Sequence, residues 1–102
     1  MNVVIFEDES RAANYLGRLI QKVDPEIKIV VKLESVRDAV PFLEANTGTD
    51  LIFADVQLAD GLSFEIFKRV SVHCPIIFTT AYDHYAIEAF KTNGIDYLLK
   101  PV

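Results

Sequence analysis

Residue types that often reveal a function directly are scarce in this sequence. It contains one cysteine, Cys74, which excludes an internal disulfide and any metal site built on cysteine spacing. No apolar stretch approaches the roughly 20 residues of a membrane-spanning helix. The N-terminus also lacks the basic region and long apolar stretch of a secretory signal. We therefore expect a cytoplasmic protein that makes no contact with membranes.

Positive charge is also in short supply. The 102 residues include 10 lysines and arginines against 15 acidic residues, which gives a net charge of −5. Such a segment is not expected to bind nucleic acid or an anionic membrane surface, so any DNA binding would require a separate effector domain. The apolar fraction of 51% and the charged fraction of 25% are ordinary for one small globular domain with a single core.

Short apolar runs alternate with stretches of helical spacing and indicate strands. Because runs this short are typical of a parallel sheet covered on both faces, the sequence predicts a three-layer α/β domain with right-handed crossovers. Two lysines within the second run favour an edge position for that strand. The runs are Val3–Phe6, Ile27–Leu33, Leu51–Ala54, Ile76–Phe78 and Tyr97–Leu99.

The first two predicted helices follow the first two strands. The first begins at residues 9–10 and ends at residues 24–25. The second begins at Ser35, because Asp38 three residues later completes the pattern of a capping box. Pro41 falls inside this second helix and predicts that it is short or bent.

Two more helices are predicted in the second half of the chain. A polar loop between Asp55 and Gly61 leads to a short helix over Leu62–Val70. The fourth helix begins after Asp83, a plausible N-cap, and ends at residues 93–94, an Asn-Gly pair typical of helix ends.

Four of the apolar runs lead into side chains that can take part in chemistry. Glu7 and Asp8 follow the first run, Asp55 the third, Thr80 the fourth and Lys100 the fifth. Parallel α/β sheets bind ligands outside the carboxyl ends of their strands. We therefore expect these five side chains to meet at one rim of the sheet.

The residue types at this rim fit one class of chemistry. Three carboxylates at close range repel one another, so either one has a raised pKa or a divalent cation binds among them. An oxygen-only cluster favours Mg²⁺, which keeps several waters and accepts a phosphate oxygen. Lys100 and Thr80 would contact phosphoryl oxygens through a charge and a hydroxyl. The set therefore predicts phosphoryl transfer to a carboxylate nucleophile.

Each of these residues also has an ordinary explanation when it is considered alone. Acidic residues after the first run would favour the N-terminus of the following helix, and Asp55 would be a common loop residue. Lys100 would then only solubilise the surface, and Thr80 would only begin a turn. The order and spacing of all five together favour a site.

These landmarks also resemble a known family. The stretch Phe6–Glu9, Asp55 after its apolar run, Gly61, the Thr80-Ala81 pair and Tyr97–Pro101 are similar to the receiver domain of two-component response regulators, over the whole chain and in the same order. The resemblance implies a flavodoxin-like, doubly wound, five-stranded parallel sheet with strand order 2-1-3-4-5. The stretch from Thr80 to Ala86, with Ala89-Phe90, resembles receivers that precede LytTR-type DNA-binding domains.

The resemblance implies a role for each acidic residue. Asp55 would accept a phosphoryl group from the phosphohistidine of a sensor histidine kinase. Glu7 and Asp8 would hold Mg²⁺ together with Asp55, and the backbone carbonyl of Gln57 would complete the protein ligands. Glu7 is a departure, because the family commonly has Asp there. Its side chain is one methylene longer, which leaves open whether it binds the metal directly or through a metal-bound water.

The resemblance also implies a conformational switch. Thr80 and Lys100 would contact the phosphoryl group, Tyr97 would turn inward as Thr80 moves, and the bond from Lys100 to Pro101 would be cis. Gln57 and Tyr82 occupy positions that govern attack by water, and we expect slow hydrolysis. The only catalysis expected is self-catalysed phosphotransfer and slow autodephosphorylation, serving to control an output, most simply transcription.

The sequence ends directly after the fifth predicted strand. We therefore expect residues 1–102 to be one receiver domain that is truncated after this strand and lacks the final helix and the effector. In the family, the final helix builds much of the dimer surface together with the fourth helix and fifth strand, so the resemblance implies a homodimer through the latter two elements. DNA would be bound only through the absent effector.

Three other functions share parts of this pattern. A haloacid-dehalogenase-like phosphatase would use Asp55 as nucleophile but needs an acid at position 57, which is Gln. A flavodoxin-like cofactor binder needs a phosphate loop after the first strand, where this chain has acidic residues. A receiver-like interaction module that is never phosphorylated is the main alternative.

Overall fold

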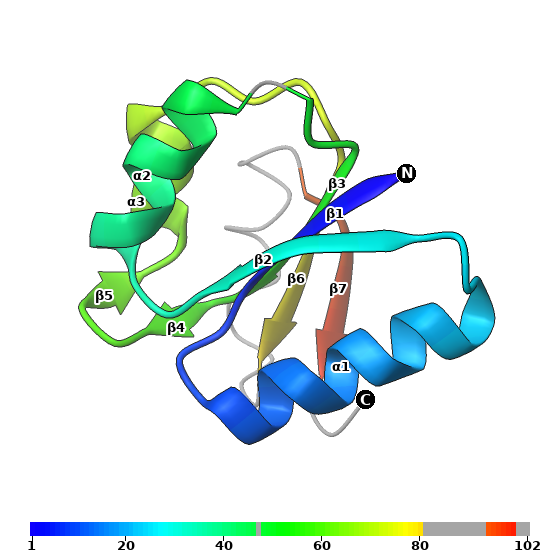
Figure 1. Ribbon diagram of the computed structural model, residues 1–102. Coiled ribbons are helices and arrows are strands. Elements are labelled where there is room, and N and C mark those ends of the chain that lie inside the picture. Colours follow the sequence, from blue (N-terminus) through cyan, green and yellow to red (C-terminus); the bar gives the residue numbers. More distant parts are fainter. Residues whose placement is uncertain (47, 81–93, 100–102) are drawn as a thin grey trace.

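Five parallel strands form one sheet in the computed structural model of the chain, which describes residues 1–46, 48–80 and 94–99 (Figure 1). Their order is β2-β1-β3-β6-β7, and all four neighbouring pairs are parallel. Because β6 and β7 are the fourth and fifth predicted strands, the predicted order 2-1-3-4-5 is confirmed. The strands are β1 (Asn2–Phe6), β2 (Lys28–Leu33), β3 (Leu51–Asp55), β6 (Ile76–Thr80) and β7 (Gly94–Leu99).

Helices lie on both faces of this sheet, as the three-layer prediction requires. Helix α1 (Ser10–Val23) covers one face, and α2 (Val36–Ala45) and α3 (Phe64–Arg69) lie together on the other (Figure 1). The predicted fourth helix, at residues 83–94, lies outside the described residues except for Gly94, which begins β7. None of the helices in the described ranges has both the length and the apolar character needed to cross a bilayer.

The side chains of β1 show why its sequence is apolar from Val3 to Phe6. Val3 and Ile5 pack in the cluster beneath α1, whereas Val4 and Phe6 pack in the larger cluster beneath α2 and α3. All four side chains are fully buried. A strand that is buried on both faces reads as a continuous apolar run, because successive side chains point to opposite sides.

Three phenylalanines join α3 to the sheet. The Phe78 ring in β6 lies 4.9 Å from the Phe64 ring and 5.8 Å from the Phe67 ring, measured between centroids. The second pair has an edge-to-face geometry, with 85° between the ring planes. Tilted and edge-to-face pairs at this range are favourable. Aromatic packing therefore helps to anchor the short helix α3 to β6, together with the fully buried Ile66.

Strand β2 lies at an edge of the sheet, as its lysines predicted. Its register against β1 shifts by one residue, so Val30 has no partner there and is 42% exposed. This irregularity explains the imperfect alternation of the sequence: Ile29 packs toward α1, and Val31 packs toward the opposite layer. A bulge of this kind also makes an edge strand a poorer template for pairing with other chains.

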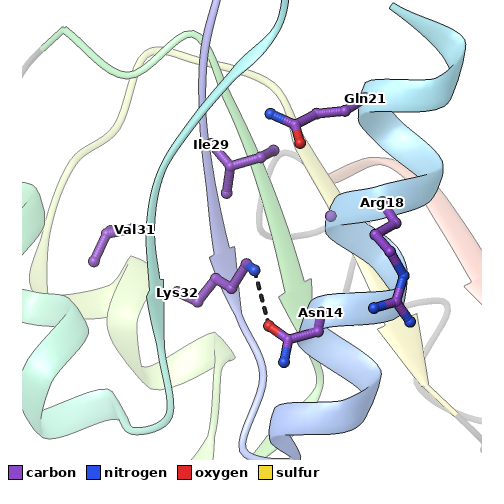
Figure 2. A pocket seen from close by; sticks show the side chains of 7 residues that line it. Asn14, Arg18, Gln21, Ile29, Val31 and Lys32 are labelled. Atoms are coloured by element: carbon purple, nitrogen blue, oxygen red, sulfur yellow. Dashed lines mark hydrogen bonds between the residues drawn. The ribbon is translucent and has the colours of Figure 1, made fainter. Parts of the chain in front are cut away.

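A groove of about 480 Å³ runs between α1 and β2 (Figure 2). Lys32 lies across it, and its Nζ donates a hydrogen bond to Asn14 Oδ1 at 2.9 Å. The Lys32 stem passes over Gly17, where a Cβ atom would lie 3.4 Å from Lys32 Cε. Lys32 thus covers apolar surface with its stem while its charge stays at the surface. The groove is lined by Asn14, Gly17, Arg18, Gln21, Ile29, Val31 and Lys32.

The start of α2 confirms the predicted cap. Ser35 Oγ accepts a hydrogen bond from the backbone N–H of Asp38 at 3.1 Å. The helix has 10 residues and is short, as Pro41 predicted, but it runs through Pro41 rather than ending there.

The segment after Asp55 differs from the predicted polar loop. Residues Gln57–Leu58 (β4) and Gly61–Leu62 (β5) form a short antiparallel hairpin. Val56 is fully buried and Leu58 is 6% exposed, so the segment contributes to the core. The prediction was wrong because two apolar residues are too short a pattern to indicate a strand, whereas in the structure Val56 and Leu58 are buried and Gln57 between them is exposed.

The single thiol is expected to react slowly in the folded chain. Cys74 is half-buried against the larger core cluster, and this burial raises the pKa of its thiol. Because only the thiolate is nucleophilic, native protein should be alkylated by iodoacetamide at neutral pH severalfold more slowly than urea-unfolded protein. Mass spectrometry of timed samples measures both rates, and equal rates would contradict the expectation.

Candidate acidic site

Three of the predicted site residues stand at the carboxyl ends of neighbouring strands. Because Phe6 in β1 pairs with Ala54 in β3, the following residues Glu7 and Asp55 are brought level with each other. Asp55 in turn pairs with Thr79 in β6, and Thr80 follows directly. The parallel order of β1, β3 and β6 therefore places Glu7, Asp55 and Thr80 at one rim.

The acidic side chains meet at this rim as predicted. Glu7, Asp8 and Asp55 each offer a carboxylate oxygen, and these three atoms lie within 4.8 Å of one another. Glu7 is 5% exposed and Asp55 is 8% exposed, whereas Asp8 is exposed to solvent. The cluster thus has two carboxylates set into the protein and one facing water.

Glu7 is held by two hydrogen bonds. Its backbone N–H donates to the carbonyl of Leu33 at 2.8 Å, and its Oε2 accepts from the backbone N–H of Glu9 at 3.2 Å. Glu9 is the N-cap residue of α1, so Glu7 also supports the start of this helix. The ordinary explanation for an acid at this position and the site explanation therefore both apply to Glu7.

Asp55 is fixed by the strands on either side of it. The next residue, Val56, donates its backbone N–H to the carbonyl of Thr79 at 2.9 Å, which ties the end of β3 to β6. Asp55 Oδ1 accepts a hydrogen bond from the backbone N–H of Gln57 at 3.3 Å. The beginning of the β4–β5 hairpin therefore helps to orient the carboxylate.

The remaining predicted site residues are described to different extents. Thr80 is buried at the end of β6. Tyr97 lies in β7, where its backbone pairs with Phe78. Lys100, Pro101 and Tyr82 lie outside the described residues, and with them the predicted contact of the lysine and the predicted cis bond.

Comparison with known proteins identifies the family of this chain. The response regulator receiver domain family matches residues 3–102. The chain belongs to this family. Among solved structures, the response regulatory domain of protein mrkE from Klebsiella pneumoniae is similar, with a TM-score of 0.88 and 31% identity, over 100% of this chain and 84% of that one.

Curated relatives of this receiver confirm the finer resemblance as well. The sensory transduction protein LytT of Bacillus anthracis is 36% identical over 99% of this chain, and LytR of Streptococcus mutans is 36% identical over 99%. These are LytTR-type regulators, as the stretch from Thr80 to Ala86 predicted. The receiver spans 42% and 43% of the length of these two relatives.

The donor atoms of the acidic cluster fit a hard divalent cation. All three side chains offer oxygen, and their carboxylate oxygens are near enough to share one ion. Two of these carboxylates are nearly buried, and repulsion between like charges is only weakly screened in the protein interior. A bound cation would relieve this repulsion. The exposed third carboxylate leaves the cluster open to water, which Mg²⁺ usually retains. The receiver can therefore hold Mg²⁺ at this site.

Asp60 was not predicted from the sequence to have a role, yet it connects the β4–β5 hairpin to the start of α2. Its Oδ1 accepts the backbone N–H of Val36 at 2.7 Å, and its Oδ2 accepts that of Arg37 at 3.0 Å. These backbone hydrogen bonds, that from Val36 foremost, lower the pKa of Asp60. The signal in the sequence was the Asp60-Gly61 pair, because such pairs mark tight turns and Gly61 has a positive φ of 150°.

Proposed function

We propose that this receiver accepts a phosphoryl group on Asp55 from the phosphohistidine of a sensor histidine kinase in a Mg²⁺-dependent reaction. The observation that carries the proposal is the cluster itself, in which the Asp55 carboxylate lies within 4.8 Å of those of Glu7 and Asp8. Phosphoryl transfer needs positioning and charge neutralisation more than covalent help from the protein. The family match supports the same reaction.

In this reaction an Asp55 oxygen attacks the phosphorus atom as the phosphorus–nitrogen bond to histidine breaks. The Gln57 N–H and the link from Val56 to β6 keep the carboxylate oriented for attack. Glu7, Asp8, Asp55 and the Gln57 carbonyl would hold Mg²⁺, which when bound neutralises charge on the phosphoryl oxygens. Thr80 and Lys100 would bind these oxygens after transfer, and we expect slow hydrolysis of the product.

We propose that phosphorylation changes the conformation of β6 and β7. Thr80 ends β6, and Tyr97 lies opposite Phe78 in β7, so a movement of Thr80 toward the phosphoryl group would be felt by the neighbouring strand. We propose that residues 1–102 form one receiver domain in the cytoplasm. The switch would control transcription through an effector that binds DNA, with a homodimer forming through the fourth helix and β7.

The proposal is tested with acetyl phosphate as phosphoryl donor. Incubation with Mg²⁺ should add the mass of one phosphoryl group to the wild-type chain, and Asp55→Asn should add none, because it removes the nucleophile. Intact-mass spectrometry measures the adduct. Asp38→Asn makes the same chemical change on α2 and should behave as wild type, and EDTA should abolish the reaction.

Absence of the adduct in the wild type would contradict phosphotransfer to this chain. Such a result would favour the interaction module that keeps the fold without being phosphorylated. The same adduct on Asp55→Asn would show that another residue is the phosphoacceptor.

A further inference from the structure

The short connection between β2 and α2 touches both loops of the acidic site. The Leu33 carbonyl accepts the backbone N–H of Glu7 at 2.8 Å. The next carbonyl, that of Glu34, accepts the backbone N–H of Ala59 at 3.1 Å, at the tip of the β4–β5 hairpin. One segment of chain therefore supports the residue after β1 and the hairpin after β3.

Asp60 strengthens the second of these contacts. Its two carboxylate oxygens accept the first two N–H groups of α2, from Val36 and Arg37. Ser35 Oγ accepts the third, from Asp38. The N–H groups of a first helical turn have no partner within the helix. Here all three are satisfied by side chains, two of them by a residue from the hairpin.

The tip of the hairpin is held differently from its base. Each of its strands has two residues, and hairpins of this size are not stable alone. Val56 and Leu58 are buried at its base, but Ala59, Asp60 and Gly61 at its tip are exposed. Polar bonds to the start of α2 therefore position the tip, and Asp60 supplies two of them.

We propose that Asp60 is a positioning residue for the acidic site. By fixing the hairpin to the start of α2, it holds Gln57, whose N–H bonds the Asp55 carboxylate. The inference rests on the proposed function, in which the carbonyl of Gln57 is also a metal ligand. If Asp60 only capped α2, its substitution would change the stability of the protein but not the metal affinity of the site.

Two variants separate positioning from capping. Asp60→Ala removes the two hydrogen bonds that connect the hairpin to the first two N–H groups of α2. Ser35→Ala removes a cap from the same helix end and leaves the hairpin contacts intact, so it is the matched control. Asp60→Asn keeps the size and one acceptor oxygen and should give an intermediate result.

Hydrogen exchange followed by NMR tests the hairpin without metal. The Ala59 amide should exchange faster in Asp60→Ala than in the wild type, whereas Ser35→Ala should leave it unchanged. Unchanged exchange of Ala59 in Asp60→Ala would overturn the inference, and so would equal acceleration in Ser35→Ala.

Calorimetric titration with Mg²⁺ alone tests the site. Asp60→Ala should raise the Kd about tenfold, the scale typical of residues that orient metal ligands. Ser35→Ala should match the wild type. If the wild type binds Mg²⁺ and Asp60→Ala binds it equally well, only this inference is overturned. If the wild type binds no Mg²⁺, the proposed function is overturned together with the metal part of the inference.

Discussion

Asp8→Asn is expected to raise the Kd for Mg²⁺ by about 100-fold, which is the upper end of the effect that the loss of an orienting residue has. The substitution removes one negative charge from a cluster of three carboxylates whose oxygens lie within 4.8 Å. Asp8 is the exposed member and is not buried against the protein as Glu7 and Asp55 are. The Asp8→Asn protein should therefore fold normally but bind the cation weakly. Titration calorimetry with Mg²⁺ measures this affinity.

Two further variants define the specificity of this effect. Glu7→Gln should weaken Mg²⁺ binding less than Asp8→Asn does, because Glu7 Oε2 already accepts the N–H of Glu9 and is partly engaged by the protein. Glu9→Gln removes a neighbouring exposed charge outside the cluster and should leave the Kd unchanged. An Asp8→Asn protein with wild-type affinity would show that the metal lies elsewhere.

Phe78→Ala is expected to lower the free energy of unfolding by about 3–5 kcal/mol. The Phe78 side chain is fully buried in β6, and its ring contacts those of Phe64 and Phe67. Its removal leaves a cavity and takes away the packing that anchors α3. Because small domains are stable by only about 5–15 kcal/mol, the variant should lose a large part of its stability. Urea unfolding monitored by circular dichroism gives the difference.

Phe78→Leu is the control for this packing effect. It keeps most of the buried volume and should cost less than half as much as the alanine variant. If Phe78→Ala lowers the free energy of unfolding by less than about 1 kcal/mol, the aromatic contacts to α3 are not a principal support of this face.

The arrangement of the sheet could be predicted from the sequence because its signals are local. Each of the five strands of the main sheet contains a short apolar run, and the lysines of β2 marked its place at the edge. The acidic site followed from the same pattern. Once the strands are parallel, residues directly after them, such as Glu7 and Asp55, must meet at one rim.

The hairpin and the role of Asp60 could not be predicted in the same way. Strands of two residues carry no periodicity, and the bonds from Asp60 reach Val36, which is 24 residues away along the chain. The register shift at Val30 was also hidden, because it depends on how β2 meets β1. Such features depend on tertiary contacts that no local pattern encodes.

The place of β1 between β2 and β3 has a consequence for synthesis of the chain on the ribosome. This strand is made before both of its neighbours, so one of its edges stays without a partner until residue 55 has left the exit tunnel. The side chains from Val3 to Phe6, which are fully buried in the folded chain, lack part of their cover during that interval, and exposed apolar surface makes a nascent chain prone to associate wrongly. Closure of β3 onto β1 ends that interval and, in the same event, brings Asp55 to the two N-terminal acids.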